Sequence, residues 1–268
     1  MRRSRLPFSA FSLLSLPLLA PVIAGLLSPT WAYAAPQLVA ADAGAVMDGG
    51  DASAPSIEAK NVVLPNEFSV AGGGDDGSRY LGKLSLSRVA WDSYAATWNF
   101  GAHGFSGVVI RDGEVLSAGW AKNASDINVL SYAVQADGLV GRVVKADSKK
   151  VGGELLKPAT GTMTDDLVGK YLQNGKGPDG KKYAGSVVIS KVGEGTYTLK
   201  WVVGGSIIHG LGIWAKRENG DVLTVAFPSA ESDYGARQYV IGADRKLRGT
   251  WIQSVSGILS SGTEQSTQ

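Results

Sequence analysis

An internal duplication constrains the fold of this chain more than any other feature of its 268-residue sequence. A first copy begins at Phe68 and a second at Tyr171, an offset of 103 residues. At this offset the copies match in order at Asp76 and Asp179, Tyr80 and Tyr183, Tyr94 and Tyr197, Trp98 and Trp201, and Ile110 and Ile213. A four-residue insertion in the second copy then moves the offset to 107, which pairs Gly113, Tyr132 and Asp137 with Gly220, Tyr239 and Asp244. Chance does not supply glycines, aromatic residues and turns in one shared order, so the chain contains a repeated structural unit.

The local pattern within each copy is typical of β-strands. Residues 197–201 read Tyr-Thr-Leu-Lys-Trp, and this strict alternation of apolar and polar side chains places one strand face in a core. Asp-Gly and Asn-Gly pairs, at 112–113 and 219–220 for example, separate such runs and favour tight hairpin turns. The sequence therefore predicts an all-β protein of two tandem homologous antiparallel units, with about six or seven strands each. Each unit closes as its own small barrel or sandwich, or the two form one body; the pattern is compatible with either.

Composition indicates the boundaries around the two copies. Residues 61–147 form the first β repeat and residues 169–256 the second. Residues 148–168 contain two adjacent glycines and a proline, which predicts a connector with at most a short helix. Residues 257–268 are predicted to be a polar tail. Residues 35–60 are rich in Ala, Asp, Gly and Ser and hold no aromatic residue, so we expect a flexible linker there.

Residues 1–34 have the organisation of a secretory signal peptide. Arginines at positions 2, 3 and 5 precede an apolar run, and Ala32 and Ala34 supply the small side chains of a signal-peptidase site. We expect cleavage of this segment and a periplasmic or secreted protein with no transmembrane span after cleavage. The chain has no cysteine, which excludes disulfides, thiolate metal sites and a cysteine nucleophile.

The charge balance argues against nucleic acid as a partner. Residues 1–34 hold three of the 26 basic side chains and none of the 24 acidic ones, so the remaining chain has a net charge of −1 with neutral histidines. The charge is unevenly distributed, because residues 169–253 carry 12 basic and seven acidic side chains. We interpret this excess as a solvated basic face, and the alternative is a surface for anionic lipid, glycan or an acidic protein.

The repeated motif combines Asp-Gly, Tyr-x-Gly before alternating apolar residues, Tyr-x-apolar-x-Trp, a Gly-to-Ile run, and Asp-x-x-Leu-x-Gly. The second copy carries it at residues 178–180, 183–185, 197–201, 210–213 and 244–251. The first copy departs from it at Val143 and at Ala90-Trp91. The motif resembles a largely uncharacterised family of exported bacterial tandem β-repeat proteins, some of which are labelled fibronectin-binding. The resemblance implies the β-repeat fold and assigns no functional residue.

The residues offer little for catalysis or metal binding. His103 and His209, the two histidines, are not equivalent in the repeat, and a metal site needs three or more converging ligands. A hydrolase built on His209 has no nucleophile-elbow motif to support it. The paired aspartates at 75–76 and 165–166 lack the spacing of a calcium loop and are interpreted as turn residues. We therefore predict no enzymatic activity, no metal and no cofactor.

Aromatic residues found in only one copy are the best candidates for binding. Trp214 lies beside the four-residue insertion with Lys216 and Arg217, near His209, and Tyr234 is a second aromatic residue without an aromatic counterpart. A tryptophan beside basic side chains can anchor a protein partner or a sugar. The competing interpretation is that Trp214 covers the end of a barrel.

These features favour a non-enzymatic exported binding module or an envelope-associated structural protein, with a matrix-binding adhesin as one version. Its partner would be an extracellular protein, a glycan or an envelope component. The first alternative is a lipocalin-like carrier, which requires an accessible cavity inside a barrel. The second alternative is an envelope hydrolase.

Overall fold

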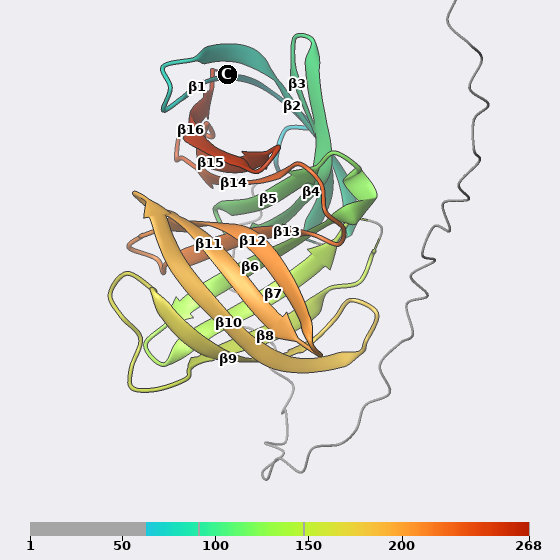
Figure 1. Ribbon diagram of the computed structural model, residues 1–268. Coiled ribbons are helices and arrows are strands. Elements are labelled where there is room, and N and C mark those ends of the chain that lie inside the picture. Colours follow the sequence, from blue (N-terminus) through green and yellow to red (C-terminus); the bar gives the residue numbers. More distant parts are fainter. Residues whose placement is uncertain (1–62, 91, 147, 268) are drawn as a thin grey trace, which may run out of the picture. The chain divides into compact units, whose positions relative to one another are not determined.

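The computed structural model describes residues 63–90, 92–146 and 148–267, and Figure 1 shows their arrangement. The expected signal peptide (1–34) and linker (35–60) lie outside the described residues, as does Trp91. The described chain is all-β, as the alternation predicts. Its strands are β1 (Glu67–Gly74), β2 (Arg79–Ala90), β3 (Ser93–Phe100), β4 (His103–Asp112), β5 (Val115–Ala121), β6 (Ile127–Gln135), β7 (Gly138–Lys145), β8 (Gly152–Pro158), β9 (Gly169–Lys176), β10 (Lys182–Gly193), β11 (Thr196–Val203), β12 (Ser206–Ala215), β13 (Val222–Pro228), β14 (Tyr234–Ile241), β15 (Leu247–Val255) and β16 (Ile258–Ser266), and the 3-10 turn η1 (Ala124–Asp126) joins β5 to β6.

The strands form two closed antiparallel barrels of eight strands each. Barrel A has the order β1-β16-β15-β14-β5-β4-β3-β2, and barrel B the order β10-β11-β12-β13-β6-β7-β8-β9. Each barrel therefore takes five strands from one repeat and three from the other. Figure 1 shows this exchange in its colours, because blue-green and red strands share barrel A whereas green and orange strands share barrel B. The two copies are interlocked, which the sequence left undecided.

Two segments fold differently from the sequence-based expectation. The predicted connector, residues 148–168, contains strand β8, and the predicted polar tail, residues 257–268, contains β16. Both strands alternate, but their inward positions include polar or glycine residues. In β16 these inward positions are Gly262, Glu264 and Ser266. A search for apolar periodicity misses such strands, so each repeat has eight strands rather than six or seven.

Buried side chains fill both barrel interiors. Barrel A packs Phe68, Leu84, Trp98 and Leu116 into one cluster, and the partly buried Phe100 and Phe105 extend it. Barrel B is filled in the same way by the cluster Leu130, Tyr132, Leu139, Leu156, Tyr171, Tyr197, Leu199 and Trp201. The recurring pairs Trp98 and Trp201, and Tyr132 and Tyr239, are therefore core positions.

A third cluster of buried residues contains side chains of both barrels. Ile110 of β4 and Ala236 of β14 belong to barrel A, and Ile127 of β6 and Ile213 of β12 belong to barrel B. A buried polar chain accompanies this apolar layer. Ser117 of β5 hydrogen-bonds Ser131 of β6 at 3.1 Å and Thr224 of β13 at 2.7 Å, and Gln238 of β14 donates to Thr224 at 2.9 Å.

This polar chain follows the internal symmetry of the duplication. Ser117 and Thr224 are equivalent at the offset of 107, and so are Ser131 and Gln238. The hydrogen bond between Ser117 and Thr224 therefore joins the same position of the two copies. Buried hydroxyl and amide groups are costly without hydrogen-bond partners. The hydrogen bonds among these four side chains therefore favour this particular packing of β5 and β14 of barrel A against β6 and β13 of barrel B.

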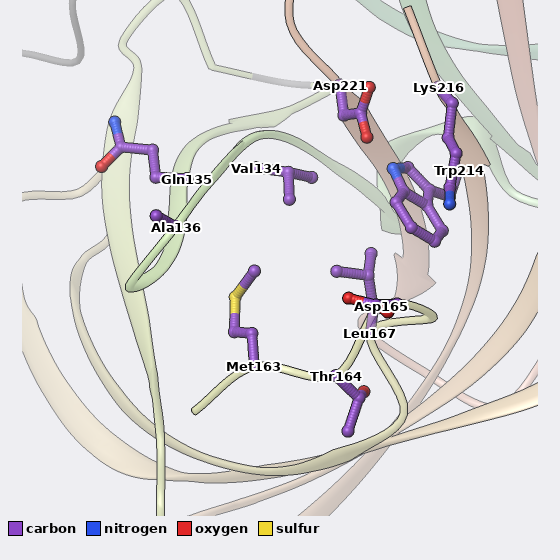
Figure 2. Close-up of a pocket in the computed structure, with 10 residues that line it drawn as sticks. All are labelled: Val134, Gln135, Ala136, Met163, Thr164, Asp165, Leu167, Trp214, Lys216 and Asp221. Atoms are coloured by element: carbon purple, nitrogen blue, oxygen red, sulfur yellow. The ribbon is translucent and has the colours of Figure 1, made fainter. Parts of the chain in front are cut away.

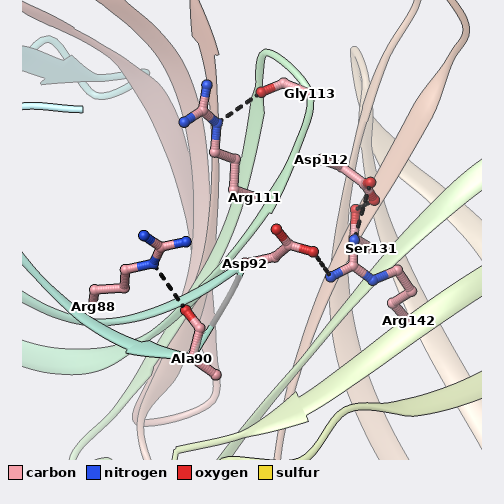
Figure 3. Close-up of polar contacts among 8 residues, drawn as sticks. All are labelled: Arg88, Ala90, Asp92, Arg111, Asp112, Gly113, Ser131 and Arg142. Carbon is pink, nitrogen blue, oxygen red and sulfur yellow. Dashed lines mark hydrogen bonds and ion pairs between the residues drawn. The ribbon is translucent and has the colours of Figure 1, made fainter. Parts of the chain in front are cut away.

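An arginine of barrel B also pairs with two carboxylates of barrel A (Figure 3). Arg142 of β7 contacts Asp92 at 2.8 Å and Asp112 at 3.4 Å, and Ser131 donates to Asp112 at 2.9 Å. Burial raises the pKa of Asp112, and the nearby Arg142 guanidinium opposes this rise. In the same view Arg111 donates through Nε to the Gly113 carbonyl at 2.9 Å.

No helix in the described residues is long and apolar enough to span a membrane.

Candidate functional site

Barrel A encloses a buried glutamate that accepts hydrogen bonds from three side chains of two other strands. Glu264 of β16 accepts from Arg237 of β14 at 2.6 Å, from Tyr80 of β2 at 2.8 Å and from Tyr239 of β14. Trp98 Nε1 in turn donates to the Tyr239 hydroxyl at 2.7 Å. Glu264 and Arg237 have side-chain exposures of 0 and 3%, so the ion pair is sealed from solvent.

Barrel B repeats this arrangement without the cation. Glu154 of β8 accepts from Tyr183 at 2.7 Å, from Gln173 at 2.8 Å and from Tyr132. Leu130 stands where the other copy has Arg237. Burial raises the pKa of Glu154, an effect that the tyrosine and glutamine hydrogen bonds oppose. Burial, together with the Glu154 charge, raises the pKa of Tyr183 far above its ordinary value.

The two buried glutamates are interpreted as architectural groups. Glu154 and Glu264 are 6 and 4% exposed as residues, and their carboxylates are occupied by hydrogen bonds within the barrels. Each glutamate lies on a strand of one repeat and accepts a hydrogen bond from a tyrosine on a strand of the other repeat. This tyrosine is Tyr183 for Glu154 and Tyr80 for Glu264. They therefore tie the exchanged strands to the barrel that receives them.

A surface hollow of about 480 Å³ lies at one end of barrel B (Figure 2). Three segments line it: the end of β6 with its turn, the segment between β8 and β9, and the segment between β12 and β13. Its lining residues are Val134, Gln135, Ala136, Met163, Thr164, Asp165, Leu167, Trp214, Lys216 and Asp221. Six residues link β12 to β13, whereas two link β4 to β5 in the first copy, so the insertion forms part of this rim.

The structure brings two of the sequence-predicted site residues together at this hollow. Lys216 Nζ lies 4.5 Å from the centre of the Trp214 ring. Trp214 also lies against Tyr197, with ring centroids 6.3 Å apart, and its indole nitrogen is buried with no hydrogen-bond partner in the structure. The position equivalent to Trp214 in the first copy is Arg111, so this aromatic wall is particular to barrel B.

The other three predicted residues do not line the hollow. Arg217 forms an ion pair with Glu114 at 2.6 Å and donates its backbone N–H to Asp221 at 2.8 Å, so it holds the rim loop. His209 is exposed on β12, five residues before Trp214 and therefore about 16 Å away along the strand. Tyr234 is 8% exposed in β14 of barrel A, within the cluster that both barrels share, where burial raises its pKa to about 12.

Sequence reasoning missed the apolar side of the hollow. Met163 and Leu167 come from the segment that was expected to be a plain connector, and Val134 comes from the end of β6. Leu167 has a φ of 62°, a conformation that non-glycine residues rarely adopt. Asp166 accepts from the Val168 N–H at 3.2 Å, and Thr164 donates to the Val168 carbonyl at 2.8 Å. The second aspartate of the 165–166 pair is thus a turn residue.

A larger hollow, of about 1140 Å³, follows β1 and its neighbours in barrel A. The stretch from Ala71 to Gly74, which lacks large side chains, lines it together with Arg79, Leu81 and Arg248 and with Tyr80 and Glu264 of the buried hydrogen-bond cluster. Phe68 and Val70 point into the barrel, so the alternation turns Ala71 and Gly73 outward. Arg248 is held by Asp244 at 2.7 Å, which lowers the pKa of Asp244 to about 2.

The described residues contain no group of three or more His, Asp or Glu side chains that could hold a metal ion. At the 75–76 pair, Asp76 accepts from the Ser78 N–H at 2.9 Å, which identifies a turn.

The fold defines a class of protein: two eight-stranded barrels that exchange strands within one chain, with a surface hollow at the end of the second barrel. No family model, curated protein or solved structure matches the chain.

Proposed function

We propose that this chain is an exported, non-enzymatic binding module that recognises a saccharide at the Trp214 end of barrel B. One observation carries this proposal. The insertion between β12 and β13 and the segment between β8 and β9, which has no equivalent inside the first copy, meet at one hollow around Trp214. The insertion departs from the internal symmetry, and the shorter β4–β5 link of the first copy shows that closing a barrel does not require it, so its position at the hollow indicates a site.

The lining of the hollow has the chemistry of a sugar site. Sugars present apolar C–H faces together with hydroxyl groups, and Trp214, Val134 and Met163 offer apolar surface for such a face. Carboxylate and amide groups at the rim, on Asp165 and Gln135 among others, are hydrogen-bond partners for hydroxyls. Lys216 adds a positive charge beside the indole, which favours a saccharide that carries an acidic group.

The packing of the barrel interiors favours surface binding over carriage. A lipocalin-like carrier needs an accessible cavity inside a barrel, and large buried side chains fill both interiors here. The hollow around Trp214 lies at the end of barrel B. For a hydrolase, His209 makes no side-chain hydrogen bond to a catalytic partner within the described residues, and it lies away from the hollow.

The test is a binding panel of neutral and acidic envelope and matrix saccharides, with fibronectin as a protein probe because of the family resemblance. We expect retention of an acidic saccharide, weakened by salt. Trp214→Ala should reduce affinity by about tenfold or more, and Lys216→Met should remove most of the salt dependence. Lys246→Met, at an exposed lysine in the β14–β15 turn of barrel A, is the matched control and should bind normally.

Two outcomes would overturn the saccharide proposal. One is that the purified protein retains no member of the panel. The other is that a saccharide is retained equally well by Trp214→Ala. If fibronectin alone is captured and Trp214→Ala abolishes the capture, a matrix-binding adhesin replaces the saccharide-binding module.

A further inference from the structure

The outer face of barrel B carries a set of exposed aliphatic side chains, which we call the aliphatic patch. It consists of Leu172 of β9, Val188 of β10, Val202 of β11 and Ile207 of β12, with exposures of 51, 42, 44 and 57%. These strands are consecutive neighbours in the barrel (Figure 1). Ser186 pairs with both Leu172 and Val202, and Val202 pairs with Ile207, so three of the four lie in one row across the sheet. Val188 lies two residues from Ser186 on the same face.

Lysines surround the aliphatic patch. Val188 lies between Lys170 of β9 and Lys200 of β11, and Leu172 lies opposite Lys157 of β8. Lys176 and Lys182 pair with each other on the same outward face. Within β8–β12, all of which the structure describes, no outward-facing position holds an aspartate or a glutamate. The face is therefore apolar and basic, and Lys157 at its edge forms an ion pair with Asp137 of the β6–β7 turn.

The duplication supplies an internal control for this surface. The positions in barrel A that are equivalent to Leu172, Val188, Val202 and Ile207 are Ser69, Ser85, Asn99 and Gly104. Where barrel B has Lys170 and Lys200, barrel A has Glu67 and Thr97. Because the same strands form the same kind of barrel with polar residues at these positions, closing the barrel does not require the aliphatic patch or its lysines.

We propose that this face of barrel B docks on a lipid bilayer whose surface is rich in anionic phospholipid. The outside of a barrel is convex, which suits an extended surface rather than an enclosed small ligand. The patch holds Leu, Val and Ile with lysines and lacks the Trp, Tyr and Arg side chains that dominate protein–protein hot spots. Short aliphatic side chains enter the interfacial layer of a bilayer, while lysines extend their ammonium groups to lipid phosphates.

This docking surface is separate from the Trp214 hollow. None of the aliphatic patch or its lysines lines the hollow. Leu172, Val202 and Ile207 point outward, whereas Trp214 is packed against Tyr197 of the barrel interior. Docking on a membrane would thus leave the saccharide site at the barrel end open, and either activity can fail without the other.

The test is co-sedimentation of the purified protein with vesicles of phosphatidylcholine, with and without phosphatidylglycerol. We expect binding to the vesicles that contain phosphatidylglycerol and a loss of this binding at high salt. Lys170→Glu with Lys200→Glu should lower the partition coefficient by about tenfold or more, and Leu172→Ser with Ile207→Ser by about tenfold. All proteins carry the same N-terminal segment, so differences among them report the outer face.

The matched control reverses two exposed basic residues of barrel A, Arg79→Glu with Lys246→Glu, and should leave vesicle binding unchanged. Trp214→Ala should also leave it unchanged, which separates this inference from the proposed saccharide site. Circular dichroism checks that each variant is folded. Failure of the wild-type protein to bind either kind of vesicle, equal binding to both kinds, or equal binding by the patch variants would each overturn the proposal.

Discussion

At the scale of single residues, the two equivalent glutamates face opposite electrostatic situations. Glu264 is paired with Arg237, whereas Glu154 has tyrosines and a glutamine as its hydrogen-bond partners and no cation among them. Burial raises the pKa of Glu154, so the folded state holds this proton more tightly than the unfolded chain. The stability that protonated Glu154 contributes is present below the unfolded pKa of about 4.3. It is lost as pH rises through that value towards the raised folded pKa.

We therefore predict opposite effects for the same substitution in the two barrels. Glu154→Gln should stabilise the protein at pH 7 by about 1–2 kcal/mol, and this gain should disappear near pH 4, because it removes a buried uncompensated charge. The Gln173 carbonyl oxygen, which has no hydrogen-bond partner, is available to accept from the new amide. Glu264→Gln should destabilise by about 3–5 kcal/mol at pH 7, because it leaves Arg237 buried without its counter-ion.

Urea denaturation of the wild-type protein and both variants at pH 4 and pH 7 measures these differences. The two substitutions are matched in chemistry and in position within the repeat. A loss of stability in Glu154→Gln as large as that in Glu264→Gln would show that the hydrogen bonds from Tyr132, Tyr183 and Gln173 outweigh the desolvation of the carboxylate.

At the scale of elements, β16 closes barrel A although its sequence resembles a tail. It pairs with β15 through eight residue pairs and with β1 through five. Gly262 is required at the centre of the strand, because an added Cβ would lie 2.1 Å from the Gly73 carbonyl oxygen and 2.6 Å from the Trp251 ring. Removal of the strand would open two sheet edges and take Glu264 from Arg237.

We predict that a chain ending at Gly257 loses barrel A but keeps barrel B. All eight strands of barrel B lie between β6 and β13 and remain in this chain. Hydrogen exchange should show lost protection in β1–β4 and retained protection in β9–β11. Gly262→Ala is the milder variant and should destabilise by about 1–3 kcal/mol. Unchanged protection of β1–β4 in the truncated chain would contradict the assignment of β16 to the barrel.

At the scale of the whole molecule, strand exchange makes the repeat and the barrel different units. Each repeat runs over eight consecutive strands, β1–β8 or β9–β16, but each barrel contains strands of both repeats. Neither repeat alone can complete a barrel in the arrangement seen here. The covalent link between the repeats is the segment between β8 and β9, which lies at the surface hollow.

We predict that cutting this link leaves the molecule assembled. A protease site introduced between Thr160 and Asp165 should yield two fragments that elute together in native size-exclusion chromatography and separate in denaturant. Fragments expressed separately should be unfolded or self-associated alone and should regain cooperative unfolding when mixed. Two independently folded fragments that do not associate would contradict the exchange of strands, and cleavage within the β2–β3 turn is the control for nicking itself.

The difference between local sequence patterns and long-range strand pairing explains which features of the fold and the site the sequence could predict. The offset of 103 residues, the alternation at residues 197–201 and the Asp-Gly turns predicted two related β units, because these signals are local and repeat. Trp214 and Lys216 were identified by their departure from the repeat, and they do meet. Tyr234 is near Trp214 in sequence, but β12 and β14 belong to different barrels, so Tyr234 could not be placed from the sequence. His209 shares β12 with Trp214 but lies five residues away along the strand.

The residues by themselves determined that this chain is β-structured and predicted two similar units with recurring tyrosines and tryptophans, since period-two alternation and turn chemistry act over a few neighbouring residues. Only the tertiary structure decided which strands share a barrel, because strand pairing joins residues far apart in the chain and either partner copy offers nearly the same edge. Tertiary structure likewise gathered Leu172, Val188, Val202 and Ile207, which are scattered in sequence, onto one outward face.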